Sequence, residues 1–358
     1  MIKSLKLIDF RNYENIDFTF NPGINFIYGK NGQGKTNLIE SLYLTTHLKS
    51  FRTSKISDLC AFSKKISTVQ TSLLKQNVHH DVRITLHENL KRVLHNQKSV
   101  NYTSEYIKNF LSLLFSPDQL VAFKEFPLER RNFIDRILFR VDEKYFQRIK
   151  EFNRIRKQKN VLLRNRNKKE ISVWNQLIAF VIPEIVNSRE WIVKKINGVL
   201  AEIFCALTGR NISLEFYYGS DLKGKTDNSP ESILRYLAEK LDQEIGNGYC
   251  LFGPHKDNFW MTLDGKKDRQ TFSQGEYRVA YLSLQLAMNQ IISSELGFKP
   301  ILLLDDIFSE LDDIICEKTV SYIIQSDNQV FITSTTIPER FKEIENTICI
   351  HAGKLSTV

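Results

Sequence analysis

The chain has 358 residues, of which 42% are hydrophobic, 11% aromatic and 25% charged. This composition supplies a sizeable core in up to two domains and excludes a wholly disordered chain. No apolar run approaches the roughly 20 residues of a membrane-spanning helix. The N-terminus lacks the hydrophobic stretch of a signal peptide, and the five scattered cysteines argue against a disulfide framework or a structural zinc site. We therefore expect a soluble, cytoplasmic protein with no membrane partner.

The net charge is +9, and one segment holds the basic excess. Residues 130–170 contain 15 basic and 5 acidic residues, a net charge of +10, so the rest of the chain is nearly neutral. A concentrated basic segment is typical of a protein that binds a polyanion. A solvated helix face explains the composition alone equally well.

The first third of the chain reads as strands around one helix. Residues 3–10 alternate between polar and apolar at period two, and residues 24–28 form a short apolar run before a glycine. A helix is expected from Thr36, where apolar residues recur at helical spacing. A β-meander is expected next, over residues 69–74, 81–87 and 92–100.

The middle of the chain has a helical texture. From residue 128 to about residue 207 there is almost no Gly or Pro, and apolar residues recur at helical intervals. This pattern predicts a helical pair with a polar tip near residues 164–170, like a short coiled-coil arm. Pro183 is expected to start or kink a later helix. Strands are expected at 211–218 and 259–265, with a helix opening at Pro230 between them.

From residue 275 onward, helix and strand alternate, which indicates a mostly parallel sheet. The expected elements are helices over 275–294 and 313–324 and strands over 300–304, 329–333 and 347–351. The fold class predicted for the terminal parts of the chain is therefore α/β.

Residues 29–36, Gly-Lys-Asn-Gly-Gln-Gly-Lys-Thr, match the Walker A pattern between an apolar run and a predicted helix. Glycines let backbone N–H groups point at phosphates, and the helix N-terminus adds the positive end of its dipole. Lys35 is expected to reach the β- and γ-phosphates, and the Thr36 hydroxyl to bind Mg²⁺. We expect ATP and Mg²⁺ as cofactors. The expected nucleotide-binding residues are Gly29, Lys30, Asn31, Gly32, Gln33, Gly34, Lys35 and Thr36.

Residues 301–306 form a buried-strand pattern that ends in two carboxylates. Interpreted as a Walker B motif, Asp305 holds Mg²⁺, directly or through water, and Asp306 polarises the attacking water. Asp often follows a strand, so this pattern alone is weak evidence. The Walker A motif supports the interpretation, because that motif requires an acidic residue as a metal partner. The long separation between Lys35 and Asp305 is typical of ABC-type ATPases and unlike small GTPases or nucleotide kinases.

Smaller features favour the same class. Ser273 and Gly275 open a predicted helix as in an ABC signature motif, where they would face a γ-phosphate bound on a second protomer. Taken alone, this pair is better explained as a helix cap. Residues 309–312 lie at the distance of a D-loop, and the polar run 333–336 ends the next strand, where a switch residue would sense the γ-phosphate.

Several short runs carry a narrower resemblance. Besides the Walker A run, they are residues 9–13 (Asp-Phe-Arg-Asn-Tyr), 21–23 (Asn-Pro-Gly), 49–53 (Lys-Ser-Phe-Arg-Thr), 115–118 (Phe-Ser-Pro-Asp), 130–135 (Arg-Arg-Asn-Phe-Ile-Asp), 253–257 (Gly-Pro-His-Lys-Asp), 273–276 (Ser-Gln-Gly-Glu) and 304–312. With these runs, the chain resembles the RecF family of bacterial recombination-repair ATPases, which are related to SMC heads, nearly from end to end.

The resemblance implies an ABC-type head, residues 1–118 plus 270–358, and a mostly helical second lobe or arm, residues 119–269. It implies a slow, DNA-stimulated ATPase that forms a homodimer when ATP is bound. The dimer would bind double-stranded DNA, especially next to single-stranded gaps, and work with RecR and RecO to help load RecA. Arg11 and Asn12 match positions near the nucleotide base, and Gln119 falls where a Q-loop residue would approach the metal or the water.

Two departures and two alternatives accompany this interpretation. Many ABC ATPases have Glu where this chain has Asp306, and the switch histidine is replaced by Thr or Ser, so we expect slow turnover. The nucleotide-binding subunit of an ABC transporter is one alternative, which predicts a neutral helical lobe. A DNA-binding or scaffold protein with a purely structural nucleotide site is the other. His255 is more simply structural or nucleotide-adjacent than catalytic.

Overall fold

The computed structural model describes residues 1–267, 272–308, 311–335 and 347–356, and the chain divides into two compact units. The first unit comprises Met1–Val121, Ala206–Thr208 and Gly297–Val358, and the second comprises Ala122–Cys205 and Gly209–Leu296. This division differs from the expected lobes, because the helix after residue 272 groups with the second unit. Its Tyr281 ring packs on Phe123, with ring centroids 4.9 Å apart. No helix among the described residues is long and apolar enough to span a membrane.

A six-stranded antiparallel sheet belongs to the first unit, in the order β2-β1-β4-β5-β6-β7. Its strands are β1 (Ile2–Phe10), β2 (Tyr13–Thr19), β4 (Ile66–Lys75), β5 (Val78–His87), β6 (Leu90–His95) and β7 (Lys98–Ser99). Buried and accessible residues alternate along β4 and β5, so one face of the sheet packs on the core. The expected strand at 3–10 and the β-meander are confirmed, whereas β2 was not predicted.

A second six-stranded sheet has the order β15-β14-β3-β13-β12-β8. Its strands are β3 (Ile24–Tyr28), β8 (Ser112–Phe115), β12 (Ile301–Leu304), β13 (Val330–Ser334), β14 (Thr347–His351) and β15 (Lys354–Ser356). All neighbouring pairs are parallel except β14 with β15. Strands β12 and β13 are buried throughout and β3 is buried at its three central residues, as expected for strands covered on both faces. The mostly parallel sheet is confirmed, although β8 was not predicted.

The helices of the first unit are α1 (Lys35–His47), α2 (Thr103–Asn109), α11 (Asp313–Gln325) and the 3-10 helix η1 (Ile56–Leu59), and α3 (Pro117–Glu125) begins in this unit. Helix α1 is buried along most of its length. It belongs to a core cluster that also contains Leu7 and Ile84 of the antiparallel sheet and Leu303 and Phe331 of the parallel sheet. The P-loop helix is therefore fixed by packing on both sheets.

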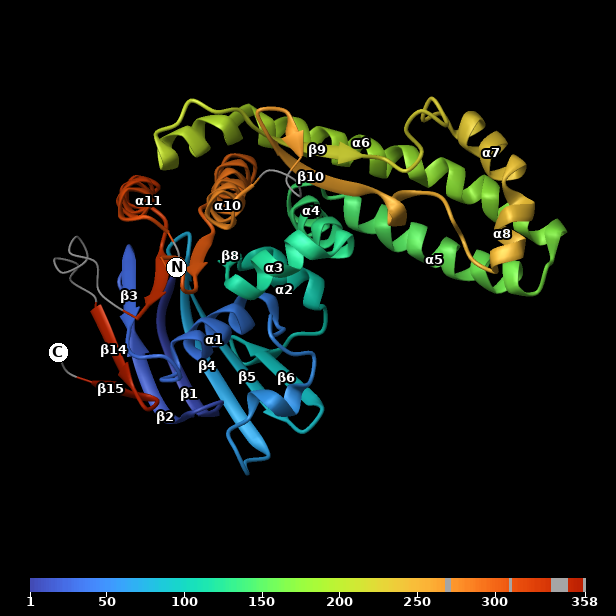
Figure 1. The fold of residues 1–358 in the computed structure, drawn as a ribbon. Coiled ribbons are helices and arrows are strands. Elements are labelled where there is room, and N and C mark those ends of the chain that lie inside the picture. The colour runs from blue at the N-terminus through green and yellow to red at the C-terminus, as the bar shows by residue number, and fades with distance from the viewer. Residues whose placement is uncertain (268–271, 309–310, 336–346, 357–358) are drawn as a thin grey trace. The chain divides into compact units, whose positions relative to one another are not determined.

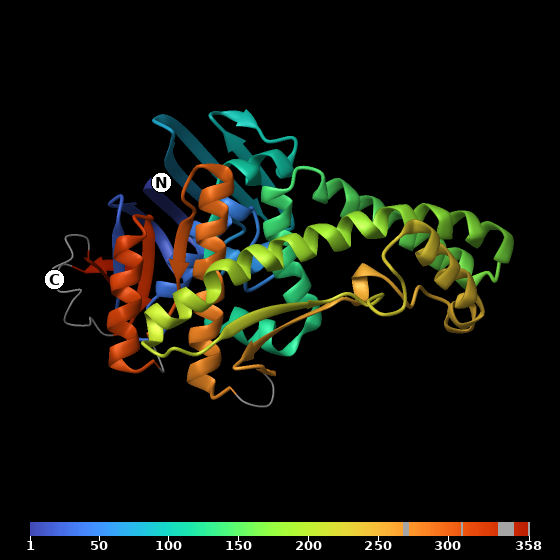
Figure 2. The same cartoon turned by 90° about the horizontal axis from the view of Figure 1, so that it is seen from above.

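The second unit is mostly helical, as predicted. Its helices are α4 (Pro127–Val141), α5 (Tyr145–Arg164), α6 (Lys168–Thr208), α7 (Pro230–Glu239), α8 (Leu241–Asn247), α10 (Gln274–Leu296) and the 3-10 helix η2 (Pro254–Lys256). A small antiparallel sheet has the order β11-β10-β9, from Lys266–Lys267, Asn258–Leu263 and Leu214–Gly219. Helices α5 and α6 lie side by side (Figures 1 and 2) and meet at a turn, which confirms the predicted pair and tip.

Of the two alternatives expected for Pro183, that it starts a helix is wrong, and that it kinks a helix stays a prediction. Helix α6 runs for 41 residues with Pro183 inside it. A proline removes one backbone hydrogen bond and disfavours a helix interior. Here Ile182, Ile185 and Val186 around it are buried, and their burial offsets that cost.

Candidate nucleotide-binding site

Four parallel strands bring polar residues to one edge of their sheet. The register pairs Phe115 with Leu304, Leu304 with Ile332, and Tyr28 with Ser334, so the residues that follow these positions line up. The Walker A loop follows β3, the two Asp residues follow β12, and the segment after β8 begins α3. Ligands of open α/β sheets bind at the carboxyl ends of the strands. This edge is therefore the candidate site.

At several positions of the Walker A loop, the backbone has φ angles that only glycine adopts without strain. Gly32 and Gly34 have φ angles of 79° and 117°. A Cβ on Gly34 would lie 2.6 Å from Asn12 Nδ2, so the loop also lacks space for a side chain there. Because the loop leads directly into α1, its N–H groups and the helix N-terminus point to the same edge of the sheet, an arrangement suited to phosphate oxygens.

Lys35 is 8% exposed, and its ammonium lies against the loop. Its Nζ donates to the carbonyl oxygens of Gly29 at 2.5 Å and Lys30 at 3.0 Å. Burial lowers the pKa of Lys35, and the nearby carboxylates of Asp306 and Asp305 partly offset that effect. A partly desolvated ammonium held by neutral carbonyls is well placed to exchange them for phosphate oxygens, which carry more negative charge.

Asp305 lies among hydroxyl groups. Its Oδ1 accepts hydrogen bonds from Thr36 Oγ1 at 3.1 Å and from Thr333 Oγ1 at 2.7 Å. Thr333 Oγ1 also accepts from the Asp306 backbone N–H at 2.9 Å. Burial raises the pKa of Asp305, and the two hydroxyl bonds act to lower it. Carboxylate and hydroxyl oxygens suit Mg²⁺, so Thr36 and Asp305 fit a magnesium ion beside a phosphate.

The β1–β2 hairpin braces the loop from outside. Asn12 Nδ2 donates to the Gln33 carbonyl at 2.9 Å, and the Tyr13 hydroxyl donates to the Gly34 carbonyl at 2.9 Å. Arg11 makes a two-pronged pair with Glu40 of α1, with both N–O distances 2.8 Å. The structure thus brings Arg11 and Asn12 to the loop and its helix. Tyr13 was not singled out as a site residue, although it ends the run 9–13.

Gln119 lies in the first turn of α3, after β8, and so at the same edge of the sheet. Its backbone N–H donates to Ser116 Oγ at 3.3 Å. In the described part of the chain, no recorded hydrogen bond joins its side chain to Thr36 or Asp305. The structure therefore places Gln119 near this edge, and its expected approach to the metal or the water stays a prediction.

Ser273 and Gly275 stand at the start of α10, in the second unit. The Ser273 hydroxyl accepts from the Glu276 N–H at 3.1 Å, and the Glu276 carboxylate accepts from the Ser273 N–H at 3.0 Å. This is a capping box, which accounts for Ser273 as a helix cap and leaves its hydroxyl proton for another acceptor. Of the expected D-loop, residues 309–310 lie outside the described residues, as does Thr336.

The basic residues of segment 130–170 divide into two groups. Some serve the second unit internally: Arg130 is buried and donates to Asn258, and Lys159 is buried in an ion pair with Glu244 at 2.5 Å. Others are exposed on one side of α5 at helical spacing. This second group, which we call the α5 basic face, consists of Lys150, Arg154, Lys157 and Arg164.

Two of the runs that carry the family resemblance, residues 130–135 and 253–257, meet at Arg189, which sequence reasoning missed. Its guanidinium donates to Asp257 at 2.6 Å and to Asp135 at 2.9 Å, and its Nε donates to the Tyr145 hydroxyl at 3.1 Å. Arg189 is 2% exposed and Asp257 fully buried. These aspartates end the runs 130–135 and 253–257, which are therefore structural. Arg189 is a lone arginine on the apolar face of a predicted helix, and this position could have indicated a buried ion pair.

His255 is structural as well, in a half-buried position of the second unit. Its Nε2 donates to the Cys250 carbonyl at 3.1 Å, and its buried Nδ1 has no hydrogen-bond partner among the described residues. Burial, with Arg156 and Lys256 nearby, lowers the pKa of His255 to about 4. Protonation would place an N–H at Nδ1 with nothing to accept it.

The free energy of unfolding should therefore fall as the pH drops from 6.5 to about 4, because in this range His255 binds a proton in the unfolded chain and not in the folded chain. His255 accounts for up to ~3 kcal/mol of this loss. Urea unfolding at a series of pH values should show a shallower loss in His255→Gln. The matched change at the exposed His87 should leave the profile unaltered. A His255→Gln profile that superimposes on the wild-type profile would contradict the assignment.

The comparisons with known proteins agree with this geometry. The sequence model of the RecF/RecN/SMC N-terminal domain family matches residues 1–355. The chain is 36% identical over 356 residues to the DNA replication and repair protein RecF of Alkaliphilus oremlandii, which covers 96% of each chain. It is 32% identical over 367 residues to RecF of Clostridium kluyveri, which covers 100% of each.

Solved structures give the same result. The fold is similar to that of a recombination mediator protein RecF solved with ATP in the RecFOR pathway, with a TM-score of 0.86, 27% identity and coverage of 100% of this chain and 97% of that one. It is also similar to an Smc head bound to the C-winged helix domain of ScpA, with a TM-score of 0.61, 16% identity and coverage of 100% and 96%. The second likeness concerns the fold alone.

Proposed function

Because the chain belongs to the RecF family of DNA replication and repair proteins, we propose that it is an ATP-dependent DNA-binding protein of recombinational repair. It binds ATP with Mg²⁺, dimerises in the ATP-bound state and holds double-stranded DNA next to single-stranded gaps. There it works with RecR and RecO to help load RecA. One observation carries the proposal: Lys35, Thr36 and Asp305 meet at the carboxyl edge of one parallel sheet.

The side chains of the first unit divide the work of hydrolysis. Lys35 would exchange the loop carbonyls for a phosphate oxygen, and Thr36 and Asp305 would hold Mg²⁺, which would neutralise negative charge on the phosphates. Asp306 orients the attacking water, with its backbone held by Thr333. The Asp306 side chain is one methylene shorter than the Glu of many ABC ATPases, so its carboxylate is a less well-placed base and turnover is slow. Slow turnover suits a timed switch.

The ATP site is completed by the α10 cap of a second copy. Ser273→Arg puts a long cation where the γ-phosphate would approach, so ATP-dependent dimerisation should be lost. Light scattering with and without ATP measures it. The change also removes a helix cap that contributes about 1 kcal/mol. Glu276→Ala therefore serves as the control, because it breaks the same capping box and leaves Ser273 in place. Equal dimer fractions in wild type and Ser273→Arg would defeat the shared-site proposal.

The α5 basic face is the proposed DNA contact. Arg154→Glu with Lys157→Glu should weaken binding to gapped duplex by about tenfold or more, because each basic residue lost forfeits a phosphate contact. The slope of log affinity against log salt should become shallower by about two. Fluorescence anisotropy at several salt concentrations measures both. The control is Lys194→Glu with Lys223→Glu, two exposed lysines away from this face. The same loss in the control pair would remove α5 from the contact.

The transporter alternative is set aside by family membership and by the charge of the helical unit. The scaffold alternative differs from the proposal in one measurable respect. A purely structural nucleotide site predicts no hydrolysis, whereas the proposal predicts slow phosphate release that stops in Asp306→Asn.

A further inference from the structure

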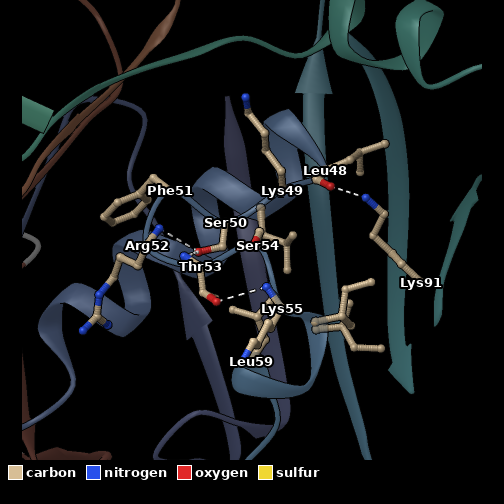
Figure 3. A pocket seen from close by; sticks show the side chains of 13 residues that line it. Leu48, Lys49, Ser50, Phe51, Arg52, Thr53, Ser54, Lys55, Leu59 and Lys91 are labelled. Carbon is tan, nitrogen blue, oxygen red and sulfur yellow. Dashed lines mark hydrogen bonds between the residues drawn. The ribbon is translucent and has the colours of Figure 1, made fainter. Parts of the chain in front are cut away.

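A hollow of about 510 Å³ lies beside α1, at the end opposite to the Walker A loop. The last turn of α1, the segment from Lys49 to Leu59, and strands β5 and β6 surround it (Figure 3). The segment from 49 to 53 is one of the runs that carry the family resemblance, and the ATPase mechanism above does not use it. All of these parts belong to the first unit.

The lining joins an aliphatic floor to a basic rim. The floor consists of Leu44, Leu48, Ile56, Leu59 and Leu86, and the rim carries Lys49, Arg52, Lys55 and Lys91. None of the 13 residues that line the hollow is acidic. The three rim lysines attract an anionic ligand and the apolar floor favours the burial of an aliphatic group, whereas Arg52 lies 3.7 Å from the carboxylate of Glu40.

The segment is held in shape without a ligand. Ser50 Oγ accepts from the backbone N–H groups of Arg52 and Thr53, at 2.9 and 3.1 Å, and the Thr53 hydroxyl donates to Asp58 at 2.6 Å. The Lys91 ammonium donates to the Leu48 carbonyl at the end of α1 (Figure 3). A preformed pocket loses little conformational entropy on binding.

We propose that this pocket binds an acidic, aliphatic peptide segment of a partner protein. An aliphatic side chain of the peptide enters the floor, and its carboxylates meet the lysines of the rim. Nucleic acid suits the pocket less well. Phe51 is the one aromatic lining residue, and its ring packs edge-on against Tyr43 with centroids 5.5 Å apart, whereas unpaired bases bind on open aromatic faces.

The pocket connects to the Walker A helix through short contacts. Arg52 donates to Asn37 at 2.9 Å and lies 3.7 Å from the carboxylate of Glu40. Asn37 in turn donates to Asn12, which holds the Gln33 carbonyl of the loop. Peptide affinity should therefore respond to ATP. This coupling rests on the proposed function, whereas peptide binding itself goes beyond it.

Fluorescence anisotropy of the full-length protein, without nucleotide or DNA, tests the site. The probe is a labelled peptide of alternating aspartate and leucine, and we expect saturable binding. Lys55→Glu should weaken it by about tenfold, because it reverses a rim charge. Ser54→Trp should abolish it by filling the hollow from an exposed position. Lys65→Glu makes the same charge change outside the pocket and should leave binding intact.

Three outcomes would overturn the proposal: no binding of the probe, an equal loss in Lys65→Glu, or binding of a labelled oligothymidylate that Ser54→Trp removes while the peptide fails to bind. The Lys35→Met variant separates this site from the nucleotide site. It should bind the probe as wild type does and show no response to ATP. Probe binding by a wild-type chain that shows no ATPase activity would keep the pocket and reject the proposed function.

Discussion

Replacing Lys35 by Met should lower ATP turnover by about two to three orders of magnitude, the usual cost of removing one positioned donor from a developing negative charge. The Lys35 ammonium is the group that the loop geometry aims at the phosphates, since two carbonyls of the loop already hold it at the sheet edge. Steady-state phosphate release measures the loss. Binding of a fluorescent ATP analogue should weaken in parallel.

The fold should survive this change. Burial already lowers the pKa of Lys35, so the folded state pays for desolvating its charge, and Met fills similar space without one. The melting temperature should stay level or rise slightly. Lys98→Met, at an exposed lysine of β7, is the matched control and should retain wild-type turnover. Wild-type turnover in Lys35→Met, with a normal melting curve, would show that this edge is not the ATP site.

The candidate nucleotide-binding site could be predicted because each of its motifs is a short continuous run of sequence. The Walker A run specifies its own loop and helix, and the apolar run 301–304 specifies a buried strand that ends at Asp305. The α/β alternation then places both at carboxyl ends of parallel strands. No pairing of distant strands had to be known for this inference.

Other parts depend on contacts between distant segments, which one sequence does not reveal. The sequence predicts Thr333 at the polar end of a strand, and only the order β3-β13-β12 brings its hydroxyl to Asp305 and Asp306. Strand β8 is too short to stand out by pattern, and α6 passes through Pro183 because its neighbours are buried. The pocket beside α1 likewise needs β5 and β6 opposite the segment 49–59.

The Arg189 network should carry the largest single-residue effect on stability. Arg189→Met leaves the carboxylates of Asp135 and Asp257 without their buried cation. Breaking a buried ion pair by removing one partner costs about 3–5 kcal/mol, because the remaining charge stays desolvated. Arg148→Met is the matched control, since that arginine pairs with Asp142 and Glu184 in a more accessible place. Its loss should cost up to about 1 kcal/mol.

The pH dependence of this deficit distinguishes lost charge from lost packing. Burial already raises the pKa of Asp257 in the wild type, against the opposing effect of Arg189. Removing Arg189 raises that pKa further, so the folded variant binds a proton that the unfolded chain lacks. The deficit measured by urea unfolding should then be largest near neutral pH and shrink as the pH falls through the raised pKa. In the double variant with Asp257→Asn, part of the stability should return. A deficit that is constant with pH and unrelieved by Asp257→Asn would mean that Arg189 acts only by filling space.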